Sequence, residues 1–500
     1  MKKFLLILLM TPMIYTNTYE HPKIQTLGLS YDDVLIIPNK SDAVTRASAS
    51  TKTRLTRNIT LNTPVISANM DTVTEGPMAI AMAQYGAIGI IHRFNTIEQQ
   101  VHEVQRVKRF TNTIIEKPLT MHAHETIGLA QEYMEAYNIS SVLVVDDSDR
   151  LVGILTARDL WFNPSKSMLI SERMTTKENL VIAPAHINKK DAKTLLLEHR
   201  IEKLPLINDD WTIAGLMTSK DIYKKDTYPN ASLDKQGRLL VGAAIGVKED
   251  AMDRAKALID AGVDVLVIDI AHGHSILAID TVKKLKQHFP NIDVIAGNVA
   301  TAEGTQALIQ AGADAIKVGV GPGSICTTRI TTGSGYPQLS AVLQCATEAA
   351  KYNIPIIADG GIKNSGDITK ALVAGASTVM LGSLLAGTKE APGLPFIKNG
   401  KKFKVIRGMA SFSANLSREV NERENNDLKK IKPYVPEGVE AIVPYKGEVI
   451  DIFTQLIGGL LSGMSYCGAS TIDQMHDEGH FVQMTSGGLR ESHSHDVIVA

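Results

Sequence analysis

Cysteine and net charge are both in short supply in this sequence, and each shortage excludes a class of protein. The 500 residues include three cysteines, Cys326, Cys345 and Cys467, and 52 basic residues balance 53 acidic ones to a formal net charge of −1. Cysteines this few and this far apart form neither a disulfide framework nor a zinc-binding spacing. A chain without excess positive charge lacks the electrostatic footprint of a nucleic-acid-binding protein. We therefore expect a cytoplasmic protein of a reducing compartment that binds no nucleic acid.

Long apolar runs are scarce as well. One short run, residues 4–10, follows Met1, Lys2 and Lys3 and has the composition of a secretory signal, but it is too brief to span a bilayer. No small-residue cleavage signature is evident before residue 21. Residues 1–21 are interpreted as a signal-like or artefactual N-terminal extension, and no membrane-spanning helix is expected elsewhere.

Eight shorter apolar runs recur between helix-like segments such as 249–261 and 302–311. Their continuous apolar character marks strands covered on both faces, and eight strand–helix units are the number that closes a (β/α)8 TIM barrel. A doubly wound open sheet is the alternative. The barrel is favoured because glycine and polar residues follow nearly every run, where barrel sites are built. The runs are residues 64–67, 87–91, 239–243, 265–269, 294–298, 315–319, 355–359 and 378–382.

An internal repeat interrupts this pattern between the second and third runs. Residues 138–145 correspond to 200–207, and residues 153–160 correspond to 215–222 at the same offset. A repeat this regular indicates an inserted module. The predicted organisation is therefore the extension, a first barrel segment at 22–111, the module at 112–232, and the rest of the barrel at 233–500 with a flap at 411–436 and a C-terminal segment.

The repeated pair resembles tandem CBS repeats, a module that senses adenine nucleotides. Hydroxyl and carboxylate side chains stand where that family often holds ribose, at Thr156, Asp159, Thr218 and Asp221. The same residue types are favoured as helix caps, so a structural role is an equal alternative. The resemblance implies an adenine or guanine nucleotide as effector.

A glycine-rich loop follows the sixth apolar run. Residues 319–329 read Gly-Val-Gly-Pro-Gly-Ser-Ile-Cys-Thr-Thr-Arg, and glycines at alternate positions leave the backbone open to an anionic or ionic ligand. A free cysteine is most often buried and inert. Cys326, however, is followed by the hydroxyls of Thr327 and Thr328 and the cation of Arg329, which a core cysteine rarely has as neighbours. The pattern favours a thiol nucleophile beside an anion site.

Polar residues also end the neighbouring predicted strands. Asp359-Gly360-Gly361 and Gly382-Ser383 follow the seventh and eighth strands, where barrels commonly bind phosphate through backbone amides. Asp269 ends the fourth strand and Asn298 the fifth, although for Asn298 a loop cap is an equal alternative. Because the carboxyl ends of barrel strands meet at one face, these residues predict a phosphorylated substrate beside the thiol.

The loop and several other stretches resemble the IMP dehydrogenase and GMP reductase family. The resemblance covers the chain apart from its N-terminal extension, and the family's loop has the form Gly-x-Gly-Pro-Gly-Ser-x-Cys-Thr-Thr-Arg. It implies a (β/α)8 barrel that acts on a purine nucleoside monophosphate with a nicotinamide cofactor. The supporting stretches are residues 31–35, 69–75, 296–299, 358–362 and 407–409.

The resemblance also implies a role for each matching residue. Cys326 is expected to attack C2 of the purine, and Thr328 and Glu437 are expected to serve the same reaction. The implied substrate-binding residues are Met70, Gly408 and Met409 at the base, Asp359 at the ribose, and Ser324, Gly361, Gly382 and Ser383 at the phosphate. The implied cofactor-binding residues are Asp269, Asn298, Gly319 and Gly321.

A potassium ion and a homotetramer follow from the same resemblance. In the family, main-chain carbonyls matching those of Gly321, Gly323 and Cys326 bind K⁺, and a C-terminal segment of the neighbouring subunit completes the site. The matching residues of that segment are Glu491, Ser492 and His493. Carbonyl oxygens suit a hard alkali cation.

Two reactions fit the resemblance. IMP dehydrogenases oxidise IMP to XMP with NAD⁺ and water, and GMP reductases convert GMP to IMP and ammonia with NADPH. The inserted module and the ending at 489–496 resemble the dehydrogenase, which is the leading interpretation, whereas residues 335–342 resemble the reductase.

The flap departs from the dehydrogenase pattern. Dehydrogenases carry an adjacent Arg-Tyr pair there that activates water, but residues 417–427 contain no such pair, and Ile406 replaces a phosphate-binding tyrosine. A GMP reductase with CBS repeats is therefore the alternative. A nucleotide-sensing regulator that has lost catalysis is a further alternative, disfavoured because a sensor needs none of the catalytic residues.

Overall fold

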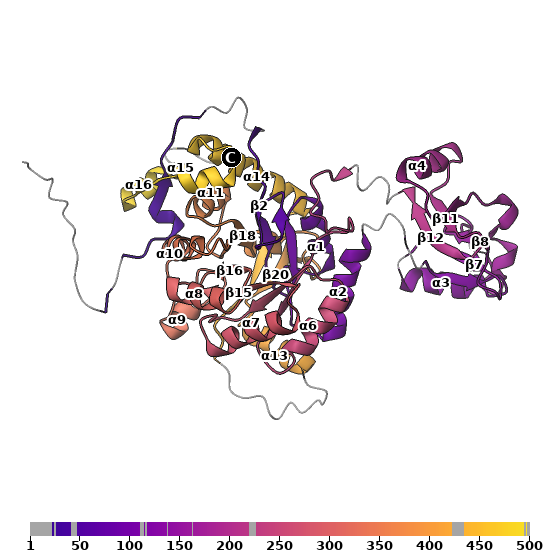
Figure 1. Ribbon diagram of the computed structural model, residues 1–500, viewed down its shortest axis with the longest axis horizontal. Coiled ribbons are helices and arrows are strands. Elements are labelled where there is room, and N and C mark those ends of the chain that lie inside the picture. The colour runs from indigo at the N-terminus through magenta and orange to yellow at the C-terminus, as the bar shows by residue number, and fades with distance from the viewer. Residues whose placement is uncertain are drawn as a thin grey trace, which may run out of the picture.

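The structure is a computed structural model that describes most of the chain. The described residues are 23–24, 27–41, 48–110, 115, 118–137, 139–162, 164–219, 227–422, 435–494 and 497. The predicted extension at 1–21, Asp221 and the flap residues 423–434 lie outside them. Figure 1 shows a barrel ringed by helices and, set apart from it, a smaller lobe formed by the predicted insertion.

Eight parallel strands close into a barrel in the order β13-β14-β15-β16-β17-β18-β4-β5. The circle is completed between β5 and β13, where Ile90 lies opposite Gly242. This closure confirms the predicted TIM barrel and excludes the open sheet. The strands are β4 (Val65–Ser67), β5 (Ile88–Ile91), β13 (Gly242–Ile245), β14 (Val265–Asp269), β15 (Asp293–Val299), β16 (Ala315–Val318), β17 (Ile356–Asp359) and β18 (Thr378–Leu381).

The third predicted strand was placed too early in the chain. The apolar run at 239–243 predicted it, but β13 begins only at Gly242. Leu239 instead forms an antiparallel bridge with Leu233, and the Val241 N–H donates to Asp264 Oδ2 at 2.8 Å. The run therefore starts in an isolated bridge that follows a turn and leads into the barrel, which periodicity alone does not distinguish from a strand.

Side chains of the barrel strands alternate between two apolar cores. Val265 and Val267 of β14 belong to the core inside the barrel, whereas Leu266 and Ile268 belong to the core between strands and helices. Because both faces of each strand are covered, the strands read as continuous apolar runs. A short hairpin of β2 (Thr53–Arg54) and β3 (Thr60–Leu61) adds Leu55 and Leu61 to the inner core.

Helices follow the strands and cover the barrel, as the sequence predicted. Three of them begin at residues whose side chains cap the first turn, namely Ser275, Thr301 and Asn364. The helices are α1 (Gly76–Gln84), α2 (Ile97–Phe110), α6 (Ala251–Asp260), α7 (Ile276–His288), α8 (Ala302–Gln310), α9 (Thr328–Thr332), α10 (Gln338–Ala350), α11 (Ser365–Val373) and α12 (Ser383–Ala386).

The insertion folds as two similar units, which agrees with its sequence repeat. Each unit contains an antiparallel strand pair, β7 with β8 or β11 with β12. A further strand pairs in parallel with the first strand of each pair: β6 with β7, and β10 with β11. The elements are β6 (Thr120–His122), α3 (Ile127–Ala136), β7 (Ser141–Val145), β8 (Leu151–Thr156), η3 (Ile170–Glu172), β9 (Thr175–Thr176), η4 (Lys177–Asn179), β10 (Ala183–Pro184), α4 (Lys189–Glu198), β11 (Lys203–Ile207) and β12 (Ile213–Thr218).

Further elements decorate the barrel. A three-stranded antiparallel sheet follows α12 and leads into the flap helix, and β1 pairs with β22. These elements are η1 (Tyr31–Asp33), β1 (Val34–Ile36), β19 (Phe396–Lys398), β20 (Lys401–Arg407), α13 (Phe412–Glu422), β21 (Glu440–Pro444), α14 (Val449–Cys467), α15 (Ile472–Glu478), β22 (Phe481–Gln483) and α16 (Ser486–Glu491).

Helix α14 is long and apolar enough to cross a membrane by length and composition, which the sequence reading did not expect. One face of the helix, however, carries buried residues such as Phe453, Leu460 and Met464 that belong to the outer core. A core helix of a soluble protein passes the same test, so composition alone is weak evidence for a membrane span.

Two glycines let α14 lie close to α11. A Cβ atom at Gly459 would fall 2.1 Å from Ser365 Oγ and 2.4 Å from its Cβ, and one at Gly463 would fall 2.5 Å from the side chain of Thr369. Atoms this close cannot be accommodated by a side-chain rotation alone. The spacing of the two helices therefore depends on the absence of side chains at these positions.

Gly459→Ala is expected to lower the free energy of unfolding by about 1–3 kcal/mol, because its methyl group would push α14 away from α11. Gly458→Ala is the matched control, since a Cβ there meets nothing within 4 Å. That control should be neutral or more stable by up to about 1 kcal/mol, because alanine favours helix. Urea unfolding of both variants measures the difference, and equal stability would contradict the close packing.

Candidate active site

The predicted catalytic residues form one chain of hydrogen bonds at the carboxyl end of the barrel. Cys326 Sγ donates to Thr328 Oγ1 at 3.2 Å, and Thr328 Oγ1 donates to Glu437 Oε2 at 2.8 Å. The backbone holds Glu437 in place, because the Thr327 N–H donates to its carbonyl oxygen at 2.8 Å and Cys326 forms a bridge with Gly438. A proton can pass between thiol and carboxylate through the Thr328 hydroxyl.

The glycine-rich loop has a shape that other residues would not allow. Gly319 has a φ of +152°, and a Cβ there would fall 2.1 Å from the carbonyl oxygen of Asp359. The Cys326 N–H donates to the carbonyl oxygen of Gly323 at 3.1 Å, so the loop turns just before the thiol. At Gly319 the group that approaches closely is thus the chain's own Asp359 carbonyl, and the predicted approach of an anionic or ionic ligand to the glycines stays a prediction.

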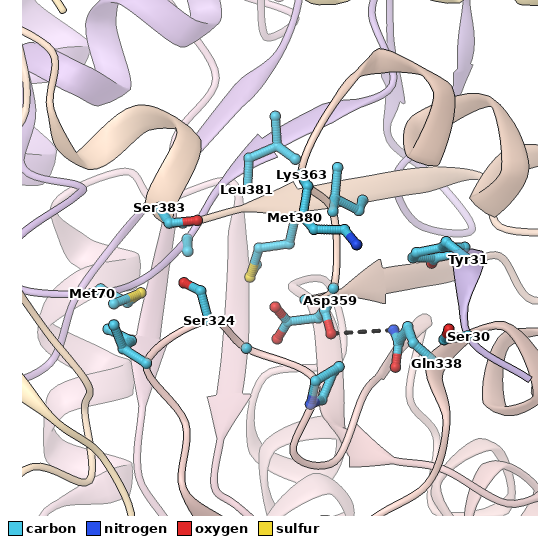
Figure 2. Close-up of a pocket in the computed structure, with 18 of the residues that line it drawn as sticks. Ser30, Tyr31, Met70, Ser324, Gln338, Asp359, Lys363, Met380, Leu381 and Ser383 are labelled. Atoms are coloured by element: carbon cyan, nitrogen blue, oxygen red, sulfur yellow. Dashed lines mark hydrogen bonds between the residues drawn. The ribbon is translucent and has the colours of Figure 1, made fainter. Parts of the chain in front are cut away.

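A cavity of about 300 Å³ lies beside this loop. Figure 2 shows Asp359 at its centre, with Ser324, Met70 and Ser383 on one side and Gln338 and Tyr31 on the other. Predicted residues that line the cavity are Met70, Ser324, Asp359, Gly361, Gly382 and Ser383. Lining residues that the sequence analysis missed as binding positions are Ser30, Tyr31, Asp32, Arg329, Gln338, Lys363 and Met380. Ile406, which replaces the expected tyrosine, also lines it.

Gly408 and Met409 are not among the residues that line the cavity. Gly408 packs instead against the loop and the Glu437 segment: its N–H donates to the Val439 carbonyl at 3.0 Å, and a Cβ there would lie 3.3 Å from the Ile325 carbonyl oxygen. The preceding residue anchors the segment, because Arg407 Nε donates to Asp71 Oδ2 at 2.7 Å.

The predicted cofactor residues meet Asp359 around a lysine that the sequence analysis did not identify. Lys317 Nζ donates to Asp359 Oδ2 at 2.8 Å, to Asp269 Oδ1 at 3.2 Å, and to Asn298 Oδ1. Asn298 Nδ2 donates in turn to Asp359 Oδ2 at 2.9 Å and to the Gly319 carbonyl at 2.7 Å. The feature of the sequence that could have identified Lys317 is its position inside an apolar run, residues 315–319. Asn298 is thus bonded within the site, not used as a cap.

Tyr31 and Gln338 bring unpaired polar atoms to the same cavity. Gln338 Nε2 donates to the carbonyl oxygens of Val318 and Asp359, at 2.9 and 3.2 Å. Among the described residues, the Gln338 Oε1 atom and the Tyr31 hydroxyl have no hydrogen-bond partner. Burial, reinforced by the carboxylates of Asp367 and Asp359, raises the pKa of Tyr31 above its usual range. The phenol is therefore a neutral hydrogen-bonding group at physiological pH.

The three thiols differ sharply in environment. Cys326 is half-buried, whereas Cys345 and Cys467 are buried. Burial raises the pKa of Cys345 to about 12 and that of Cys467 to about 11. Because thiolate is the nucleophilic form, these two cysteines are inert at neutral pH.

Some predicted residues are not brought to this site. Glu491 and His493 are exposed, and Ser492 Oγ donates to the carbonyl oxygen of Gly488 at 2.9 Å. Among the described residues, no group of three or more His, Cys, Asp or Glu side chains is placed so that it could hold a metal ion. The K⁺ prediction therefore depends on carbonyl oxygens.

In the insertion, Thr156 and Asp159 bond to each other. The Thr156 N–H and hydroxyl both donate to Asp159 Oδ2 at 2.7 Å. This pairing is local, but residues 157–162 form turns and not the helix whose cap the sequence analysis held as the alternative to ribose binding. Thr218 is buried, and Asp221 lies outside the described residues. Nucleotide binding by this set stays a prediction.

Comparisons with known proteins agree with the site. Residues 28–495 match the model of the IMP dehydrogenase / GMP reductase domain. Inosine-5'-monophosphate dehydrogenase of Nitrosopumilus maritimus is 54% identical over 94% of this chain and 99% of its own length. The enzyme of the same name from Aquifex aeolicus is 52% identical over 94% of this chain and 96% of its own.

Two solved structures are also similar to this chain over nearly its whole length. A substituted GMP reductase from Trypanosoma brucei in complex with guanosine 5'-monophosphate has a TM-score of 0.89 and 47% identity, and covers 95% of this chain and 99% of its own. GMP reductase from the same organism in complex with guanosine 5'-triphosphate has a TM-score of 0.79 and 42% identity, covering 92% and 99%. With the barrel, the cysteine loop and these likenesses in agreement, the chain belongs to the IMP dehydrogenase / GMP reductase family.

Proposed function

We propose that this protein oxidises IMP to XMP with NAD⁺ through a covalent intermediate on Cys326. The observation that carries the proposal is the chain of hydrogen bonds from Cys326 through Thr328 to Glu437, next to a cavity lined by Ser324 and Asp359. The dehydrogenases of N. maritimus and A. aeolicus share more than half of their aligned residues with this chain, which supports the same reaction.

The site supplies the steps of this chemistry. Addition of the Cys326 sulfur to C2 of the purine makes that carbon tetrahedral, so that it can release a hydride. When bound, the nicotinamide supplies the hydride acceptor. Loss of the hydride leaves a thioimidate, and water then adds to C2 as the carbon–sulfur bond breaks to give XMP and the free thiol. Glu437, through the Thr328 hydroxyl, accepts the proton of that water.

The proposed cofactor residues fit a nicotinamide nucleotide. The Asp269 carboxylate, at the end of β14, suits ribose hydroxyls, and the positive φ values of Gly319 and Gly321 let the loop turn after β16. Asn298 would position these groups, since its amide is bonded to Gly319 and Asp359.

A potassium ion and a homotetramer belong to the same proposal. The carbonyl oxygens of Gly321, Gly323 and Cys326 are hard donors that fit K⁺, and the turn between Gly323 and Cys326 fixes the direction of the loop. Residues 491–493 of a neighbouring subunit would complete the site, and in this chain the segment is exposed.

GMP reduction is the second candidate, favoured by the flap sequence. Without an adjacent Arg-Tyr pair in residues 417–427, activation of water would rest on Thr328 and Glu437. The structural likeness to GMP reductases supports this alternative. In that reaction the Cys326 sulfur adds to C2 of GMP, and the amine leaves as ammonia after receiving a proton from the Glu437 chain. The thioimidate that remains would accept at C2 a hydride that bound NADPH would supply, and the carbon–sulfur bond then breaks to release IMP and the free thiol.

The insertion is proposed to bind an adenine or guanine nucleotide as effector. The complex of the T. brucei GMP reductase with guanosine 5'-triphosphate supports a guanine nucleotide. A protein that only senses nucleotides is a function of another class, and the intact chain from Cys326 to Glu437 argues against it because sensing requires no nucleophile.

Turnover with each substrate pair separates the two reactions. With IMP, NAD⁺ and K⁺, the nicotinamide absorbance is expected to rise, and a Cys326→Ser variant should give no change because it lacks the thiolate. A fall in absorbance with GMP and NADPH, together with no rise in the first pair, would establish the reductase instead. No turnover with either pair would support the sensor.

Glu437→Gln is expected to lower kcat about 10²- to 10⁴-fold with little change in KM, because the amide cannot take the proton that Thr328 passes on. A single rapid release of reduced nicotinamide should persist if the reaction is IMP oxidation, since hydride transfer precedes the step that needs the base. Glu448→Gln is the matched control, because Glu448 pairs with Lys389 at the surface. Unchanged steady-state turnover in Glu437→Gln would contradict the proposed role.

Alkylation should single out Cys326. At neutral pH iodoacetamide is expected to modify Cys326 and to leave Cys345 and Cys467 unmodified, because their raised pKa values keep them protonated and both are buried. Bound IMP or GMP should slow the reaction at Cys326. Peptide mass spectrometry measures the modified sites, and modification of Cys345 at a comparable rate would refute the assignment.

A further inference from the structure

Lys317 is a charged residue in the centre of the site to which no role has been assigned. It lies on β16 among the buried residues Ala315, Ile316 and Val318, and its side chain is only 2% exposed. An ammonium group has three hydrogens, and each finds an acceptor here, on Asp269, Asn298 and Asp359. The four residues belong to four consecutive strands of the barrel, β14 to β17.

The charge on Lys317 is maintained by these partners. Burial by itself lowers the pKa of the ammonium, but the carboxylates of Asp359 and Asp269 outweigh burial and raise this pKa to about 12. Transfer of an unpaired ammonium into such a site would be strongly unfavourable, whereas a fully hydrogen-bonded one is tolerated. Lys317 is therefore positively charged throughout the pH range in which enzymes work.

The arrangement also fixes the carboxylate of Asp359. Lys317 and Asn298 both donate to Oδ2, and Asn298 is oriented to do so because its own oxygen accepts from Lys317. Among the described residues, no hydrogen bond ends on Asp359 Oδ1, and Asp359 lines the cavity. The free oxygen is the one that can accept from a substrate hydroxyl.

We propose that Lys317 is a positioning residue that joins the substrate and cofactor halves of the site through one buried ammonium. This inference rests on the proposed function, in which Asp359 binds the substrate ribose and Asp269 the cofactor ribose. Lys317 holds both carboxylates at a fixed separation, because its ammonium donates to each of them. Its loss leaves two like charges facing each other, which favours uptake of a proton by the pair.

A second buried lysine provides a matched control. Lys108 is 4% exposed and donates to Asp264 at 2.6 Å and Asp234 at 3.1 Å. Asp264 immediately precedes β14, whereas Asp269 ends it, so the two lysine clusters lie at opposite ends of one strand. Removal of Lys108 tests the general effect of losing a buried ion pair without touching the site.

The experiment measures IMP and GMP binding to the full-length protein by calorimetry from acidic to alkaline pH. At neutral pH, Lys317→Met is expected to weaken binding of the nucleotide that the wild-type protein binds by about 10- to 100-fold. The variant loses the charged hydrogen bond from Lys317 that holds the Asp359 carboxylate in position for the ribose. The variant should also lose affinity at a higher pH than the wild-type protein does when the pH is lowered. The titratable groups facing the ammonium are Asp269 and Asp359, with Tyr31 neutral beside them.

Lys317→Arg should keep the wild-type pH profile, because a guanidinium retains the charge. Lys108→Met should lower stability and leave the profile in place. If Lys317→Met does not fold, the pH dependence of nucleotide binding is measured with Lys317→Gln, whose side chain is also neutral. In the turnover assay, KM for the nicotinamide cofactor should rise in the Lys317 variants that lack charge.

An unchanged profile in the neutral Lys317 variants, or an equal displacement in Lys108→Met, would overturn the proposal. Failure of the wild-type protein to bind either IMP or GMP would refute the proposed function instead, so the two failures are distinguishable. If the wild-type protein binds nucleotide and turns it over, and Lys317→Met has the same binding profile and turnover, the proposed function stands and Lys317 has no positioning role in it.

Discussion

Closure of the barrel between β5 and β13 is the constraint on which the rest of the structure depends. The whole insertion lies in the chain between these two strands, yet they pair directly, with Ile90 opposite Gly242 and Ile91 opposite Ala243. Gly242 makes the approach possible, because a Cβ there would fall 2.4 Å from Ile90 Cδ1. Closure turns eight separate strand ends into one ring, so residues distant in sequence, such as Asp269 and Asp359, face the same lysine.

The barrel was predictable because its physical cause is repeated along the chain. A strand covered on both faces is apolar at every position, and eight such runs left little choice of architecture. The error at the third strand has a specific cause: Leu239 is as buried as its neighbours, but it bridges to Leu233 before the strand begins. A run of apolar residues indicates that the segment is buried, but it does not indicate which segment its backbone pairs with.

The site was predictable only in part. The cysteine loop, Asp359 and the glycine turns carry recognisable residue types, whereas Tyr31 and Gln338 reach the cavity from a 3-10 helix and a helix start without any local pattern. Lys317 was treated as one more member of a strand, although a lysine among Ala315, Ile316 and Val318 can be buried only with partners. The direction of the reaction is not contained in these residues, because a chain of thiol, hydroxyl and carboxylate can move a proton either way.

Strand β14 has a lysine cluster at each end, one holding Asp264 and the other Asp269. Sliding this strand by a single residue would detach both carboxylates from their ammonium groups at once and would exchange its inward and outward side chains. The apolar residues between the two carboxylates could adapt to other neighbours, but the charges at the ends could not. The two ion clusters thus fix the register of β14, and the position of the Asp269 carboxylate is set partly from the far end of the barrel.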